Sequence, residues 1–100
     1  MPKLNKTILL LGAGMEQMIA IKLAKKMGLK VIAADGNPHA PGLKHAHFGV
    51  HLDIKNLAEV IVLGKKHHVD GIMTHGVEIP VVVAKAARAL GLPHLSPAVA

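Results

Sequence analysis

Cysteine, tryptophan and tyrosine are absent from the 100-residue sequence, and Phe48 is its single phenylalanine. Without cysteine, the chain can form neither a disulfide framework nor a Cys-based metal site or nucleophile. Proteins that bind single-stranded nucleic acid stack bases on aromatic side chains, so the scarcity of aromatics argues against a nucleic-acid partner. The one serine, Ser96, stands close to the end of the sequence and offers no Ser-His-Asp arrangement. The sequence therefore identifies no catalytic residue.

Long hydrophobic runs are also missing. The apolar run at residues 8–11 ends at Gly12, far short of the ~20 residues that a membrane-spanning helix needs. Lys3 and Lys6 are not followed by the long apolar stretch and cleavage site of a signal peptide. We therefore expect a cytoplasmic protein that does not enter a membrane.

The composition that is present is globular, with 51% hydrophobic and 18% charged residues. A chain of 100 residues has room for one domain, and we expect residues 1–100 to form it. The net charge of +6 suits a small anionic substrate that carries a phosphate or a carboxylate. The same composition is compatible with a homo-oligomer.

Short apolar segments alternate with amphipathic ones along the chain, which predicts strands and helices in turn. Five strands are expected, at residues 7–11, 30–34, 48–52, 71–74 and 92–95. This order is typical of an α/β protein with a small doubly wound, Rossmann-like parallel sheet and helices on both faces. Ligands of such sheets bind beyond the carboxyl ends of the strands, where the loops from Gly12, Asp35 and His75 begin.

Three helices are expected between these strands. The first covers residues 15–27, the second runs from an N-cap at Asp53 to about His67, and the third begins near Pro80. Apolar residues four apart mark the face of the first helix that should pack on the sheet. They are Met15, Ile19, Leu23 and Met27.

The loop after the first strand is rich in glycine and precedes a helix. Such a turn brings backbone amides close to a phosphate, and the helix N-terminus favours the negative charge. The candidate binding residues are Gly12, Gly14, Met15, Glu16 and Gln17. Gln17 stands where the dinucleotide-binding fingerprint has its third glycine. A tight turn without any ligand would also select these glycines, so both interpretations stay open.

Three more candidates follow the second and fourth strands. Asp35 could hold a ribose, or it could begin an Asx-turn into the following loop. Glu78 could accept a hydrogen bond from a substrate amine or hydroxyl, or it could only stabilise the start of a helix. His75 lies beside the same edge as a donor or acceptor.

The eight histidines do not indicate a metal site. His45 and His47 are two residues apart, and His67 and His68 are adjacent. Neither spacing is the i, i+4 pair of a helical metal site, and no carboxylate completes a ligand set. We therefore expect no bound metal in this domain.

Several segments, taken in order, resemble one known domain. They are residues 8–14, 30–35, the Asn-Pro-x-Ala-Pro loop at 37–41, Asp53, the Gly-Ile-Met-Thr-His-Gly-Val-Glu segment at 71–78, and residues 91–97. Together they resemble the pre-ATP-grasp domain, which opens the ATP-grasp enzymes. These include biotin carboxylase, carbamoyl-phosphate synthase, and the purine-pathway ATP-dependent carboxylase and formate-dependent formyltransferase.

The resemblance implies the substrate-binding N-terminal domain of an ATP-dependent carboxylate-amine ligase or carboxylase. By position, it assigns the turn from Gly12 to Gln17 to the substrate and makes Glu78 the substrate-side carboxylate. Gln17 stands where the purine enzymes have a glycine. A glutamine at this position is closer to the carbamoyl-phosphate-synthase-like group. The family binds ATP and magnesium in later domains. This domain should therefore hold no cofactor, and it should be inactive without those domains or a separate chain carrying them.

Two other functions stay open beside this one. A doubly wound domain could be the NAD(P)-binding Rossmann module of a dehydrogenase, although Gln17 argues against the close packing that the third glycine allows. It could also be a non-catalytic interaction domain that keeps the fold without a ligand.

Overall fold

The computed structural model describes residues 6–74, 80–92 and 94–95. Its strands are β1 (Thr7–Leu11), β2 (Lys30–Asp35), β3 (Phe48–His51), β4 (Gly71–Thr74) and β5 (His94–Leu95). They form one sheet in the order β3-β2-β1-β4-β5, and every neighbouring pair is parallel. Since β5 pairs over only two residues, the sheet consists of four full strands and a short fifth.

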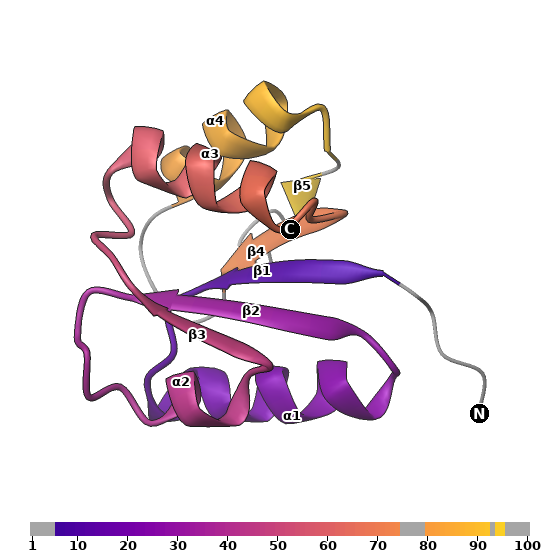
Figure 1. Ribbon diagram of the computed structural model, residues 1–100, viewed down its shortest axis with the longest axis vertical. Coiled ribbons are helices and arrows are strands. Elements are labelled where there is room, and N and C mark those ends of the chain that lie inside the picture. Colours follow the sequence, from indigo (N-terminus) through magenta and orange to yellow (C-terminus); the bar gives the residue numbers. More distant parts are fainter. Residues whose placement is uncertain (1–5, 75–79, 93, 96–100) are drawn as a thin grey trace.

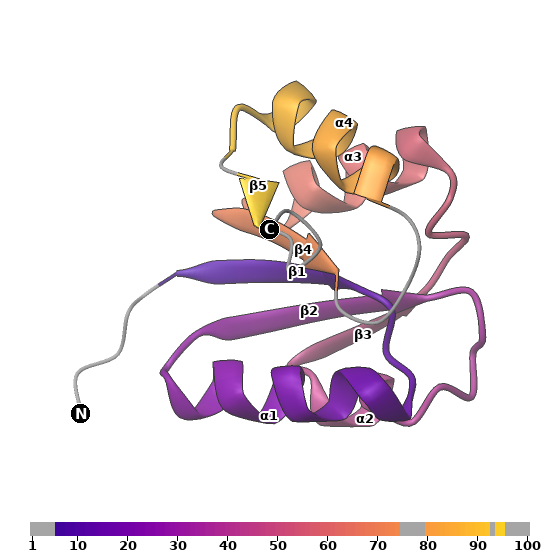
Figure 2. The same cartoon turned by 180° about the vertical axis from the view of Figure 1, so that it is seen from behind.

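Helices cover both faces of this sheet. One face carries α1 (Met18–Lys26), which is entered through a 3-10 turn at Met15–Gln17, and α2 (Gly42–His45). The other face carries α3 (Leu57–Lys66) and α4 (Pro80–Leu90), as Figure 1 shows. The view from behind shows the same layers, with the sheet between the two helix pairs (Figure 2). The predicted doubly wound α/β fold is confirmed.

The strand order reverses at β1. From β1 the chain moves to β2 and then β3 on one side, and it returns to β4 and then β5 on the other side. Doubly wound sheets bind ligands beyond the carboxyl ends of the strands at such a reversal. Gly12, which follows β1, and Thr74, which ends β4, mark this point in the present sheet.

The core lies on both faces of β1 and β2, as their unbroken apolar runs predict. Successive side chains of a strand point to opposite faces. Leu9 and Leu11 therefore join the cluster beneath α3 and α4, whereas Ile8 and Leu10 join the cluster beneath α1 and α2. All four of these side chains are buried, so β1 contributes to both clusters.

The prediction of which face of α1 packs on the sheet is wrong. The buried positions of α1 are Ile21 and Ala24. Ile21 lies close against Gly42, since a Cβ added to Gly42 would lie only 2.7 Å from Ile21 Cδ1. The chain at the start of α2 thus packs directly on Ile21. The four residues expected on that face are exposed instead: Met15 at 75%, Ile19 at 76%, Leu23 at 56% and Met27 at 44%.

The start of α3 also differs from the expectation. Its N-cap is Asn56, whose side-chain oxygen accepts from Glu59 N–H at 3.2 Å. Asp53 instead accepts from Lys55 N–H at 3.0 Å, two residues along the chain, so it forms a local turn before the helix. Both residue types favour helix starts and turns, and only the course of the chain decides which of them caps. The short helix α2 was not expected.

No helix in the described part of the chain is long and apolar enough to span a membrane.

Candidate functional site

The turn after β1 requires glycine at its first position. Gly12 has φ of 103°, which residues with a Cβ rarely adopt. Its N–H donates to Ala34 O at 2.7 Å, and Ala13 N–H donates to Asp35 Oδ2 at 2.8 Å. Ala13 O accepts from Gly42 N–H at 2.6 Å. The turn is therefore held by three bonds to the chain at and after the end of β2.

Gly14 and Gln17 meet across the 3-10 turn. Gly14 has φ of −72°, which any residue adopts, so its constraint is one of space. A Cβ added there would lie 3.0 Å from Gln17 Oε1. Gln17 is only 4% exposed, and its N–H donates to Gly14 O at 3.1 Å. The residue that replaces the third fingerprint glycine is thus packed inside the turn rather than extended into solvent.

Backbone donors are available at the start of this helix. No hydrogen bond joins the N–H groups of Gly14, Met15 or Glu16 to any residue that the structure describes. These N–H groups belong to the positive end of the helix, which favours phosphate and carboxylate groups. The side chains of Met15 and Glu16 are exposed. An anion bound here would contact the backbone, and the nearby Glu16 carboxylate would oppose a highly charged one.

Asp35 has a structural role in this site. Its Oδ1 accepts from Asn37 N–H at 2.8 Å, the Asx-turn arrangement, while its Oδ2 accepts from Ala13 N–H at 2.8 Å. The carboxylate therefore joins the glycine turn to the loop after β2. Asn37 continues this loop, since its Oδ1 accepts from His39 N–H at 2.9 Å. Contact between Asp35 and a ligand stays a prediction.

Thr74 links the carboxyl ends of β1 and β4. Its hydroxyl donates to Leu11 O at 3.0 Å, and the residue is 3% exposed. Thr74, Asn37 and Gly42 were not among the predicted site residues, because each is an ordinary strand or loop residue until the strands are paired. His75 and Glu78, the two candidates that follow Thr74, lie outside the described residues.

Two of the histidines have defined hydrogen-bond partners. His47 Nδ1 accepts from Val31 N–H at 2.9 Å, and His51 Nε2 lies 3.0 Å from Gly36 O. Both rings thus contact the backbone of β2 or of the residue after it. Within the described ranges, no three potential ligands gather around a metal-sized space.

Residues 21–94 match the family model described as the ATP-grasp N-terminal domain. N5-carboxyaminoimidazole synthetase from Staphylococcus aureus has a similar structure, with a TM-score of 0.74 and 22% identity over 96% of this chain. Phosphoribosylglycinamide synthetase from Anaerococcus prevotii gives a TM-score of 0.65 and 34% identity over 83% of this chain. The chain covers only 25% and 21% of these two proteins, respectively.

A nucleotide-sugar enzyme shares the fold as well. UDP-glucose-4-epimerase from Stenotrophomonas maltophila, whose structure contains NAD, gives a TM-score of 0.72 at 15% identity, over 88% of this chain and 35% of its own. At that identity the likeness shows the fold alone. No curated protein sequence matches the chain.

Proposed function

Because this chain belongs to the ATP-grasp N-terminal domain family, which matches residues 21–94, we propose that it is the substrate-binding domain of an ATP-dependent carboxylate-amine ligase or carboxylase. The observation that carries the proposal is the turn from Gly12 to Gln17. It lies where the strand order reverses, it is held in shape by Asp35, and it presents backbone N–H groups without a described partner. Such an arrangement suits a small substrate that carries a phosphate or a carboxylate.

Each part of the site has a separate task in this proposal. The N–H groups of Gly14, Met15 and Glu16 bind the anionic group of the substrate. Gln17 fills the space beneath the turn and keeps Gly14 in place. Because a glutamine at this position resembles the carbamoyl-phosphate-synthase-like group, we propose a substrate of the kind that this group binds. Glu78 and His75, which lie outside the described residues, would supply a carboxylate and an imidazole to contact an amine or hydroxyl of the substrate.

Among the residues that the structure describes, no set fits ATP and magnesium. The phosphate-binding motif GxxxxGK[ST] is absent from the sequence. At the edge where the strands end, the carboxylate of Asp35 already accepts from two backbone N–H groups. We assign ATP and magnesium to the complete enzyme, in domains or a separate chain beyond this one. The isolated chain should hydrolyse no ATP above background, and magnesium-dependent turnover by the purified protein would contradict this.

The runner-up is an NAD(P)-binding module, which the epimerase likeness supports at the level of the fold. Gln17 argues against it, because its buried side chain occupies the place where the fingerprint glycine allows close packing beside a pyrophosphate. A fluorescence titration with NADH separates the two functions. Weak binding supports the ligase domain, whereas a dissociation constant in the low micromolar range would favour the dehydrogenase module.

Amide chemical-shift mapping with inorganic phosphate and with bicarbonate at pH 8 tests the proposed site. We expect the largest shifts at Gly14, Met15 and Glu16, and a loss of at least tenfold in affinity in Gly14→Val. Gly36→Val is the matched control, because a Cβ added to Gly36 meets nothing closer than Leu52 O at 3.9 Å.

A different result would make the turn purely structural. That result is a Gly14→Val variant that loses stability as severely as a core truncation and still binds the anion. Retained binding in Gly14→Val together with lost binding in Gly36→Val would likewise overturn the assignment.

A further inference from the structure

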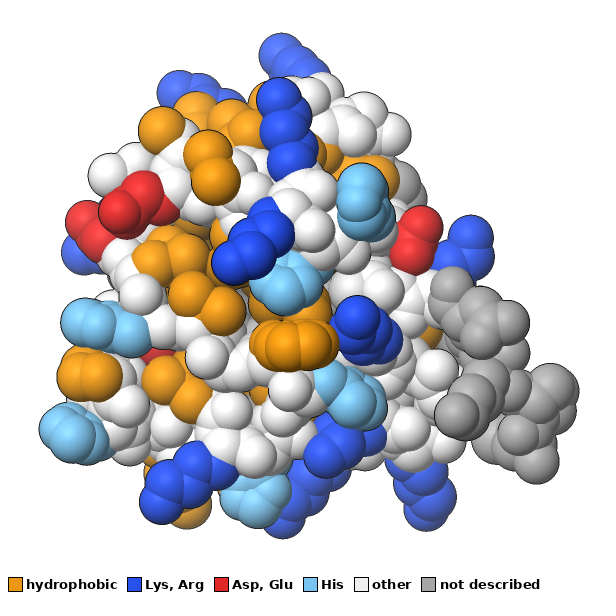
Figure 3. All heavy atoms as spheres, in the orientation of Figure 1, with side chains coloured by type: hydrophobic (Ala, Val, Ile, Leu, Met, Phe, Trp, Pro, Cys, Tyr) orange, Lys and Arg blue, Asp and Glu red, His pale blue; other side chains and the backbone are white. Residues whose placement is uncertain are grey.

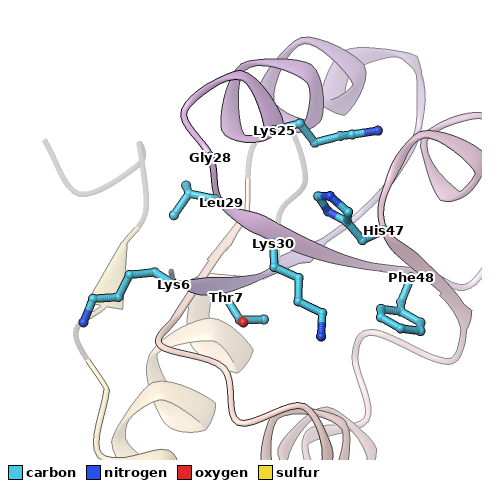
Figure 4. Close-up of a pocket in the computed structure, with 8 residues that line it drawn as sticks. All are labelled: Lys6, Thr7, Lys25, Gly28, Leu29, Lys30, His47 and Phe48. Atoms are coloured by element: carbon cyan, nitrogen blue, oxygen red, sulfur yellow. The ribbon is translucent and has the colours of Figure 1, made fainter. Parts of the chain in front are cut away.

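The opposite edge of the sheet, where β1 and β2 begin, contains a hollow of about 610 Å³. Lysine, histidine and phenylalanine side chains line it (Figure 4). This volume lies within the ~300–1,000 Å³ of small-molecule sites. The hollow is separate from the turn at Gly12, which stands at the carboxyl end of β1. It therefore belongs to no part of the site described above.

Four chain segments converge on this hollow. Thr7 and Lys30 are register partners at the starts of β1 and β2, and Lys30 N–H donates to Lys6 O at 2.9 Å. Lys25 comes from the last turn of α1, and His47 directly precedes β3. Figure 4 shows the His47 ring between the side chains of Lys25 and Lys30. The amine of Lys25 points past His47, that of Lys30 points toward Phe48, and that of Lys6 points to the other side.

The helix dipole explains only part of this positive charge. Lys25 lies in the last turn of α1, where cations are favoured, and its Nζ donates to His45 O at 2.8 Å. Lys30 starts β2 and Lys6 directly precedes β1, so neither lies in the last turn of a helix. Lys30 is held instead by Phe48, whose ring centroid is 5.1 Å from Lys30 Nζ.

His47 adds a directed donor between the two lysines. Its Nδ1 accepts from Val31 N–H at 2.9 Å, so the neutral ring carries its proton on Nε2. This bond fixes the ring against β2, and it leaves Nε2–H as the free donor. The acid beside the lining residues is Asp70, whose Oδ2 accepts from Thr7 N–H at 2.8 Å. It therefore neutralises the Thr7 end of the hollow rather than the end with His47.

A neighbouring histidine reports the same positive potential. The ring centroids of His67 and Phe48 are 5.2 Å apart. Burial lowers the pKa of His67, and the charges of Lys66, Lys30 and His68 lower it further. Positive charges from two neighbouring segments thus act on His67, beside Phe48.

We propose that this hollow is a second anion-binding site, which takes a phosphorylated small molecule. The ammonium group of Lys30 and the Nε2–H of His47 bind the phosphoryl group. Lys25, whose Nζ donates to His45 O, adds positive charge beside them. Phe48 supplies apolar surface at the margin for the rest of the ligand. A nucleic acid is the less suitable ligand, because the sequence has no other Phe, Trp or Tyr on which bases could stack. The ring of Phe48 already contacts Lys30 and His67.

Amide chemical-shift mapping of the full chain with inorganic pyrophosphate, at constant ionic strength and pH 8, tests this site. We expect saturable shifts at Val31, His47 and Phe48. We expect Lys30→Gln and Lys25→Gln each to lower the affinity at least fivefold. Lys55→Gln is the charge-matched control, because Lys55 is exposed and follows β3 at the opposite edge. Unchanged spectra outside the hollow show that each variant folds.

Two results would overturn the proposal. Equal losses in Lys55→Gln and Lys30→Gln would show attraction by net charge alone, and shifts confined to residues 12–17 would show that only the glycine turn binds anions. A 12-nucleotide single strand that binds tenfold more tightly than pyrophosphate, with the same lysine dependence, would assign the surface to nucleic acid instead. Gly14→Val should leave the hollow unaffected, so failure of this site and failure of the proposed function are distinguishable.

Discussion

The two edges of the sheet offer anions opposite kinds of partner. At the carboxyl edge the donors are backbone N–H groups, and their positions depend on Gly12, Asp35 and the start of α1. At the amino edge the donors are side chains, those of Lys30 and His47 with Lys25 beside them. Backbone donors do not titrate and are fixed by the fold, whereas the interactions of exposed ammonium groups are screened by salt. The first edge is therefore suited to specificity, and the second to attraction.

The charges of the chain follow the same division. Glu16 and Glu59 stand in first turns of helices, near the carboxyl edge, whereas basic residues stand in the last turns, near the amino edge. The basic residues are Lys25 and Lys26 in α1, Lys44 and His45 in α2, Lys65 and Lys66 in α3, and Arg88 in α4. Figure 3 shows Lys and His side chains spread over one face of the molecule, with Asp and Glu in small separate patches. The net charge of +6 is thus unevenly distributed.

The largest effect should come from breaking the core that both edges share. Ile8 is 7% exposed and packs beneath α1, so Ile8→Ala should lower the free energy of unfolding by ~2–5 kcal/mol through lost transfer energy and a cavity. Urea unfolding followed by circular dichroism measures this. The folded fraction should still bind anions at both edges. A loss at one edge alone would show that β1 positions that edge independently.

The next effect should be confined to the carboxyl edge. Gly12→Ala places a Cβ at φ of 103° and should cost ~1–3 kcal/mol in stability. Gly14→Ala is the matched control, because its φ of −72° is ordinary and its new Cβ meets only the end of the flexible Gln17 side chain. Thermal melts of both variants make the comparison. Equal destabilisation would mean that space, rather than backbone conformation, decides the sequence of the turn.

A smaller effect should follow from Asp35→Asn. The amide keeps one acceptor oxygen, but its NH₂ group cannot accept from either Ala13 or Asn37, so one backbone N–H loses its partner. We expect a loss of ~1–3 kcal/mol in stability. We also expect weaker phosphate binding at Gly14, measured by chemical-shift titration. Pyrophosphate binding at the amino edge should not change, and a parallel loss there would contradict the separation of the two edges.

The fold could be predicted largely from sequence, because its signals are local. The predicted runs at 7–11, 30–34 and 71–74 agree in position with β1, β2 and β4, and each of these strands is a short apolar run ended by glycine or a polar residue. Gly12 was predicted as a turn residue, and its positive φ gives the reason. The Asx-turn at Asp35 was one of two interpretations, and the structure shows it.

The errors lie where distant segments decide between equivalent local patterns. The first helix contains two apolar series, and the one with Ile21 and Ala24 packs with β1, β2 and the segment at Ala40, whereas Ile19 stays exposed. Asp53 and Asn56 are both suitable helix caps, and the chain enters the helix at the second. The basic hollow was missed for the same reason: Lys25, Lys30 and His47 are scattered in sequence, and only strand pairing and the course of α1 bring them together.

The smallest effect should appear at His67, which reports on the amino edge alone. Lys30→Gln removes one of the charges that lower the pKa of His67, so this pKa should rise part of the way toward its ordinary value. The remaining depression comes mainly from burial, which the variant does not change. Because the folded pKa is lowered, the unfolded state binds more protons as the pH falls below about 6.5, and stability falls with it. This loss should be smaller in Lys30→Gln than in the parent chain.

Histidine proton shifts between pH 4.5 and 8 measure the pKa of His67, and Lys55→Gln serves as the control. A pKa of His67 that is unchanged in Lys30→Gln would show that Lys30 does not act on this part of the surface, and it would weaken the contrast between the two edges.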